Sequence, residues 1–188
     1  MHARSALLLP LVLLFGVPVL LPAAVPAALA VTAKKPPHKA VGPRAIGTFE
    51  DWTAATNRES GQTVCYAFTY AKSSSIALPG RGRVVMTVTE RTGGRDAVAI
   101  SAGFTYPENA SVAVSIDNHP PEQFYTAQRS AFSRDGHATV EGFLKGLQVV
   151  ATSPAPKNAQ VIDTFSLRGF NAAYGAIVKA CPPGRAEK

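Results

Sequence analysis

The feature that most constrains this sequence is a series of short segments in which apolar and polar residues alternate. Val84, Met86 and Val88 are separated by single residues, and the same spacing recurs at Val98 and Ile100 after a glycine pair. Alternation with a period of two is typical of half-buried strands, and paired glycines allow the positive φ of a tight hairpin turn. Eight strands are expected, in residues 49–56, 63–70, 84–89, 97–102, 111–116, 124–128, 147–152 and 160–167.

Two later segments change from a period of two to the helical period of 3.6. The first places Val140, Phe143 and Leu144 on one face of a short helix that ends at Gly146. The second is an amphipathic helix that ends before Pro182, and we expect its apolar stripe to seal the open face or end of the sheet. That stripe consists of Phe170, Ala173, Tyr174, Ile177, Val178 and Cys181. Together these elements indicate a mainly β domain, either a sandwich or a barrel.

The first thirty residues have the pattern of a secretory signal peptide. Arg4 supplies a positive start, residues 6–21 form an apolar run, and residues 28–30 are the small-residue cleavage site Ala-Leu-Ala. An uncleaved membrane anchor is the alternative, because residues 5–30 carry no charged side chain and are long enough to span a bilayer. Four prolines in this stretch disfavour a continuous helix. The pattern therefore predicts export, to the periplasm or to the outer surface and medium.

Cleavage of this leader is a testable prediction. We expect the mature chain to begin at Val31, or at Lys34 if a second small-residue site is used. The intact mass of the exported protein measures the cleavage position. Exported material that retains Met1 would contradict a cleaved leader.

A basic, proline-rich segment, residues 31–45, follows the leader. Proline keeps such a segment extended and lysine keeps it solvated, so we predict a flexible tether. It serves either as a plain spacer or as a weak contact to an anionic surface. Its cations are Lys34, Lys35, Lys39 and Arg44. We expect residues 46–183 to form one domain and residues 184–188 a disordered tail.

The charge of the chain excludes one class of partner. The formal net charge is +7, but much of the excess lies in the tether, and the predicted domain is nearly neutral. The domain also lacks an aromatic and basic stripe or a recognition motif for nucleic acid. We therefore expect no nucleic-acid partner.

The chain contains two cysteines, Cys65 and Cys181. In an oxidising compartment two cysteines imply one structural disulfide. The bridge would join the second expected strand to the end of the last helix. A catalytic thiol is the alternative, but the sequence contains neither a Cys-x-x-Cys motif nor a basic cluster near either cysteine.

Two similar motifs contain the side chains most able to do chemistry. His119 follows Asp117, and His137 follows Asp135, at the same spacing. Each pair could offer oxygen and nitrogen ligands to a metal, but both lie in turn-rich segments where Asp is expected for backbone reasons. The sequence contains no Gly-x-Ser-x-Gly elbow and no phosphate-binding glycine loop. We therefore expect no metal, no cofactor and no catalytic residue.

Four further motifs are spread over residues 47–182. They are Gly47-Thr48-Phe49-Glu50-Asp51-Trp52, Cys65-Tyr66-Ala67, Val88-Thr89-Glu90-Arg91, and Asp163-Thr164-Phe165-Ser166-Leu167-Arg168-Gly169-Phe170 with the later Ala180-Cys181. Together they resemble the invasion-associated locus B family of bacterial exported proteins. Many relatives carry a further cysteine shortly after the tryptophan, where this chain has Thr53, Ala54 and Ala55. The sequence therefore resembles a two-cysteine branch of the family.

The resemblance implies an immunoglobulin-like antiparallel β-sandwich, export through the inner membrane, and no catalytic residues to carry over. One pathogen member is associated with entry into host cells, whereas most relatives occur in environmental bacteria. We therefore expect an exported, non-enzymatic binding module whose partner is a protein or polymer of the envelope or of a host surface. A periplasmic hydrolase that uses His119 or His137 is the alternative. That alternative requires both histidines in one deep pocket with Asp117 or Asp135.

Overall fold

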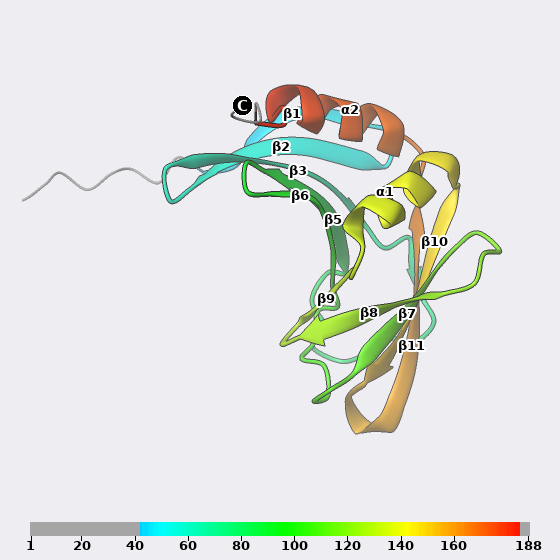
Figure 1. Cartoon of the computed structure of the whole chain (residues 1–188). Coiled ribbons are helices and arrows are strands. Elements are labelled where there is room, and N and C mark those ends of the chain that lie inside the picture. Colours follow the sequence, from blue (N-terminus) through cyan, green and yellow to red (C-terminus); the bar gives the residue numbers. More distant parts are fainter. Residues whose placement is uncertain (1–41, 185–188) are drawn as a thin grey trace, which may run out of the picture. The chain divides into compact units, whose positions relative to one another are not determined.

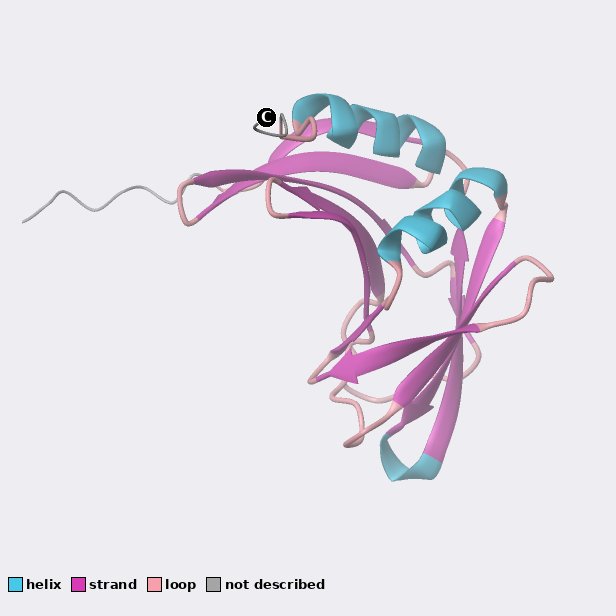
Figure 2. Ribbon diagram, in the orientation of Figure 1, coloured by secondary structure: helices cyan, strands magenta, loops and turns pink. Residues whose placement is uncertain are grey.

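A computed structural model describes residues 42–184 of the chain. The predicted leader, nearly all of the predicted tether and most of the predicted tail lie outside these residues. The described part consists of antiparallel strands and two α-helices, with a single 3-10 turn at Pro156–Asn158 (Figures 1 and 2). This confirms the mainly β fold class. Neither α-helix of the described part is long and apolar enough to cross a membrane.

All strands of residues 42–184 belong to one hydrogen-bonded sheet with the order β1-β2-β3-β5-β6-β9-β8-β7-β10-β11-β4. The strand β4 follows β3 along the chain but lies at the opposite edge of the sheet. The sheet therefore curls round its core and brings β3 back towards β11. The strands are β1 Arg44–Phe49, β2 Trp52–Glu59, β3 Gln62–Tyr70, β4 Ser73–Ser74, β5 Val85–Arg91, β6 Gly94–Ser101, β7 Ser111–Ile116, β8 Glu122–Ala127, β9 Ser130–Phe132, β10 Gln148–Ala155 and β11 Ala159–Ser166.

The sheet has eleven strands where about eight were expected. The expected strand 49–56 is two strands, because the chain turns at Glu50 and Asp51, and Glu50 has a φ of 48°. The strands β4 and β9 have two and three residues and are too short to show alternation in the sequence. Arg44, assigned to the tether from its composition, is the first residue of β1.

The hairpin of β5 and β6 shows how alternation builds the core. Met86 and Val88 pair in register with Ile100 and Val98, and all four side chains are at most 2% exposed. Their neighbours, such as Thr87, point to the outer face and are half-buried. The inward side chains of the other long strands join the same hydrophobic cluster. Removal of this apolar surface from water is the main force that holds the sheet closed.

Helix α1, Gly136–Lys145, contains the expected apolar face and ends at the expected Gly146. The Asp135 side chain caps its start and accepts a hydrogen bond from the Ala138 N–H at 3.0 Å. Gly142 is unfavourable inside a helix by propensity alone. A Cβ at this position would lie 2.5 Å from Ile116 Cδ1 of β7, so a larger residue would displace the tip of that side chain. The glycine therefore leaves room for the Ile116 side chain.

Helix α2, Phe170–Ala180, lies along β1, β2 and β3 (Figure 1). The Phe170 ring is 4.8 Å from the Trp52 ring and 5.5 Å from the Phe143 ring, measured between centroids. Trp52 Nε1 donates a hydrogen bond of 2.9 Å to the Ser166 carbonyl, just before the helix. Ile177 on the same stripe is fully buried. The stripe thus covers the inner face of these strands, as expected.

A disulfide joins Cys65 of β3 to Cys181, the residue after α2. The two cysteines are 116 positions apart in the sequence, and their Cα atoms are 5.9 Å apart. This is the pairing expected from the sequence. The bridge fixes the end of the last helix to an early strand.

Candidate functional site

His119 lies in the turn between β7 and β8, beside a cavity of about 220 Å³. The cavity is bounded by that hairpin on one side and by α1 on the other. Its walls are largely apolar, with Ile116 and Gly142 among the lining residues, and four ionisable residues also line it. These are Asp117, His119, Glu122 and Lys145. Such a pocket could accept a small apolar group.

Two of these side chains, Asp117 and His119, are held by local hydrogen bonds. Asp117 has a φ of 49°, and its Oδ1 accepts hydrogen bonds from the backbone N–H groups of Leu147 and Gln148 at 3.1 and 2.9 Å. His119 Nδ1 lies 3.0 Å from the Ile116 carbonyl of its own turn. No serine, threonine or cysteine lines this cavity. Asp117 and His119 therefore sit together without a nucleophile beside them.

His137 lies elsewhere, in the first turn of α1. Its Nδ1 is 2.9 Å from Asp96 Oδ2, and 75% of its side chain is exposed. Asp135, the other half of its motif, caps the helix. His137 does not line the His119 cavity. The structure therefore assigns the two aspartates of the repeated motif to backbone support, and it leaves the two histidines in separate places.

Within residues 42–184 no group of three or more His, Cys, Asp and Glu side chains is arranged to hold a metal ion. Both Asp-x-His motifs were considered as metal ligands from the sequence. In the folded chain Asp117 is occupied by backbone N–H groups, and His137 pairs with Asp96. The aspartate of each motif therefore accepts hydrogen bonds from backbone N–H groups.

The pair of Glu90 and Asp96 forms a buried acidic cluster at the β5–β6 hairpin. Glu90 is fully buried, and Asp96 is 8% exposed. Glu90 Oε1 accepts a hydrogen bond from the Asp96 N–H at 3.2 Å, and Glu90 Oε2 lies 2.6 Å from Arg95 Nε. Asp96 Oδ1 accepts a 2.6 Å hydrogen bond from the Tyr174 hydroxyl of α2. The cluster therefore ties one hairpin to both helices.

Burial sets the protonation of this cluster. It raises the pKa of Glu90 to about 7, and the neighbouring Asp96 side chain adds to the rise. Burial would also raise the pKa of Asp96, but hydrogen bonds from Tyr174 and His137 outweigh it and hold that pKa below its ordinary value. The hydrogen bond to Asp96 raises the pKa of His137.

Stability should therefore fall as the pH rises from about 5 to about 8. In this range the folded protein holds a proton on Glu90 that the unfolded chain has already released, so ionisation favours unfolding. His137 acts in the same direction, and the lowered pKa of Asp96 acts only in acid. We expect a loss of about 2 kcal/mol in the free energy of unfolding, most of it absent in Glu90→Gln. Urea unfolding at four pH values between 5 and 8 measures this loss. If the free energy of unfolding fell equally with pH in the wild type and in Glu90→Gln, the prediction would be contradicted.

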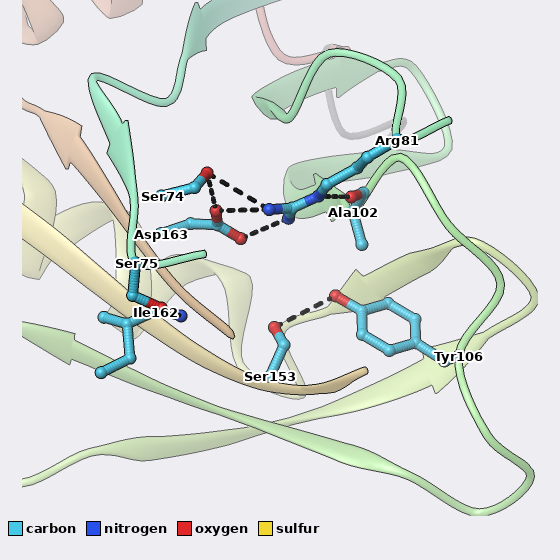
Figure 3. A network of polar contacts seen from close by, with 8 residues as sticks. All are labelled: Ser74, Ser75, Arg81, Ala102, Tyr106, Ser153, Ile162 and Asp163. Atoms are coloured by element: carbon cyan, nitrogen blue, oxygen red, sulfur yellow. Dashed lines mark hydrogen bonds and ion pairs between the residues drawn. The ribbon is translucent and has the colours of Figure 1, made fainter. Parts of the chain in front are cut away.

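A second buried charge cluster fixes the loop of residues 75–84 to the sheet (Figure 3). Arg81 donates to both carboxylate oxygens of Asp163, at 3.0 and 2.6 Å, and its Nε donates to the Ala102 carbonyl at 2.7 Å. Ser74 donates to the same carboxylate at 2.5 Å. The side chains of Arg81 and Asp163 are 7% and 1% exposed. This network was not predicted from the sequence, and it joins residues 82 positions apart.

Three aromatic side chains stand on the outer face of β3, opposite the face that α2 covers. We call Tyr66, Phe68 and Tyr70 the β3 ladder. Adjacent ring centroids are 6.0 and 5.8 Å apart, and Tyr70 is 36% exposed. The register places Thr53 and Thr87 on either side of Phe68. The ladder is thus an aromatic row on the outer face, half-buried at Tyr66 and Phe68 and exposed at Tyr70.

A family model described as invasion associated locus B (IalB) protein matches residues 52–178, more than half of the chain. The chain belongs to the invasion associated locus B family. The matched region begins at Trp52 and contains the β3 ladder, the Glu90 cluster and the Arg81–Asp163 pair. It ends three positions before Cys181.

A solved member of the locus B family has a similar fold. The crystal structure of invasion associated protein B from Bartonella henselae is similar to this structure with a TM-score of 0.52 and 16% sequence identity. The match covers 71% of this chain and 96% of that chain. At this identity the likeness shows a common fold. A comparison with curated proteins finds no match.

Proposed function

We propose that this locus B protein is an exported, non-enzymatic binding module of the bacterial envelope or surface. The leader pattern of residues 1–30 supports export, to the periplasm or the outer surface. The basic segment after it would hold the domain near an anionic surface through Lys34, Lys35 and Lys39. The partner would be a protein or polymer of the envelope or of a host surface, and not a nucleic acid.

The observation that carries this proposal is the β3 ladder. Aromatic side chains normally contribute to the core or to an interface, because each buries a large apolar area. The ladder lies on the face opposite the core, yet Tyr66, Phe68 and Tyr70 contact one another as an ordered row. Aromatic clusters that are only partly covered by the protein are typical of contact surfaces.

The buried charged groups of the domain support the same proposal, because they already have structural roles. Glu90 and Asp96 connect the helices to a hairpin, and Arg81 and Asp163 hold a loop. The hydrolase alternative needs His119 and His137 in one pocket, and no observation favours it. It is kept as an outcome of the test.

Retention of envelope material by the mature, disulfide-intact protein tests the proposal. Tagged protein is exposed to envelope extract and to host membranes, beside a Tyr66→Ser/Phe68→Ser variant of the ladder. Leu147→Ser is the matched control, because Leu147 is an exposed apolar side chain (74% exposed) on another part of the surface. We expect the ladder variant to lose retention and the control to keep it.

Two further variants separate the binding module from the hydrolase. Retention should be unchanged in His119→Ala and His137→Ala. A third variant, with Lys34, Lys35 and Lys39 replaced by Gln, measures how much of the retention comes from electrostatic contact of the tether. Equal retention by the ladder variant and the control, or turnover of a substrate that is lost in either histidine variant, would overturn the proposal.

A further inference from the structure

Two hollows lie on either side of Arg81, at the end of the β3 ladder. The first has a volume of about 370 Å³ and is lined by Tyr70, Arg81 and Arg83 among others. The second has a volume of about 320 Å³ and is lined by Arg81, Arg129 and Lys157, with Phe104. They share Leu78 and Arg81 and are therefore adjacent. We call them together the Arg81 hollows.

The Arg81 hollows are strongly positive. Four cations line them, and no Asp or Glu does. Arg81 is neutralised by the buried Asp163 behind it. Within the described residues, Arg83, Arg129 and Lys157 form no ion pair with a carboxylate. Three uncompensated cations around one loop favour an anionic ligand.

Two aromatic rings border the same hollows. Tyr70 is both the last ring of the ladder and part of the first hollow. The Arg83 guanidinium lies over that ring, 3.3 Å from its centroid. Phe104 lines the second hollow, with Arg81 5.1 Å from its ring. Ring faces and cations thus occur together at this end of the row.

The geometry of the row indicates which kind of anion fits. A single-stranded nucleic acid needs cations along its whole backbone and flat ring platforms. Here the cations of the hollows stand at the Tyr70 end, the acidic Glu59 lies near Tyr66 at the other end, and successive rings are tilted by 36° and 84°. The row is flanked by threonine hydroxyls at Thr53, Thr87 and Thr89. Rings and hydroxyls suit the apolar and polar faces of sugars better than the acyl chains of a membrane.

We infer that the β3 ladder and the Arg81 hollows together bind an acidic glycan. Its sugar rings lie against Phe68 and beside the stacked pair of Arg83 and Tyr70, and its carboxylate or phosphate groups meet Arg83, Arg129 and Lys157. This rests on the proposed function as a binding module and names the class of its ligand. The site is largely pre-formed, because the Arg81–Asp163 pair already holds the loop in place.

Binding of a defined oligosaccharide tests the inference. The probe is an oligogalacturonate, and its fully methyl-esterified form is the uncharged match. Calorimetry on the mature full chain should detect the acidic probe and show binding at least about tenfold weaker for the ester. Inorganic phosphate alone should bind more weakly than the acidic probe, because it meets no aromatic ring.

The matched variants locate the site. Arg129→Gln/Lys157→Gln should weaken binding of the acidic probe at least about tenfold. Arg44→Gln/Lys179→Gln is the charge control, because it removes the same charge from β1 and α2. It should change binding of the acidic probe less than about twofold. Lys157→Gln alone is included because it removes a charge without breaking a hydrogen bond, whereas Arg129 donates one to the Gly103 carbonyl. Phe68→Ser should weaken both the acid and the ester.

Four results would overturn the inference. The first is no binding of the acidic probe, and the second is equal binding of acid and ester. The third is an equal loss in the hollow variant and its charge control, which would reduce the effect to net charge. The fourth is phosphate binding as tight as that of the probe. If envelope material is still retained through the ladder, the binding module stands and only its ligand class is wrong.

Discussion

Replacing Cys65 and Cys181 together by alanine should lower the free energy of unfolding by about 4 kcal/mol. The bridge closes a loop between residues 116 positions apart, so it strongly restricts the unfolded chain. Cys65 is fully buried and Cys181 is 9% exposed, and alanine fits both sites without a new polar group. Equilibrium unfolding in urea, compared with that of the oxidised wild type, measures the loss.

Reduced wild-type protein is the control for this change, and its loss should be similar. Hydrogen exchange should show the largest increase in α2, because the bridge holds the end of that helix. A loss below about 1 kcal/mol would contradict the loop-closure argument. So would an increase in exchange confined to strands remote from α2.

Asp163→Ala should destabilise the protein by about 3–5 kcal/mol. The change leaves the Arg81 guanidinium buried without its carboxylate, and its side chain is only 7% exposed. It also removes the acceptor of the Ser74 hydroxyl. The loop of residues 75–84 would lose its anchor to β11. Urea unfolding measures the loss, and exchange of the Arg81 and Gly82 amides reports on the loop.

Two further variants show that the cost comes from the unpaired charge. The double change Arg81→Met/Asp163→Leu removes both charges and should recover much of the loss. Arg91→Gln breaks an exposed pair with Glu59, whose side chains are 44% and 48% exposed, and should cost less than about 1 kcal/mol. A double variant as unstable as Asp163→Ala would contradict the explanation.

The sequence predicted the strands that alternate over six residues or more and both helices. It missed the division at Glu50 and Asp51, because Glu50, the residue that takes the positive φ, is not a typical turn former. A short strand such as β9 cannot show a recognisable alternation of apolar and polar residues. Its position in the sheet is set by its neighbours β6 and β8. The continuous strand order across the whole sheet depends on such contacts.

The candidate sites were harder to predict, but two of them left a signal. Asp163 occupies an inward position between Val161 and Phe165, and Glu90 continues the inward row of Met86 and Val88. An acidic residue that the alternation places on the inner face predicts a buried partner. The sequence could not identify that partner for Asp163, because Arg81 lies 82 positions away. The histidine motifs, by contrast, were prominent in the sequence and proved to be local turn and cap structures.

The position of α2 over the earliest strands imposes an order on folding. Trp52 finds its hydrogen-bond acceptor 114 positions later, at Ser166, and its ring partner in Phe170. A chain synthesised from its amino end therefore keeps these strands uncovered until α2 has emerged, and contacts so distant in sequence form slowly. For an exported chain this delay is useful, because an unfolded polypeptide can be threaded through a membrane channel. The fold would then close on the far side, where oxidation can join Cys65 to Cys181.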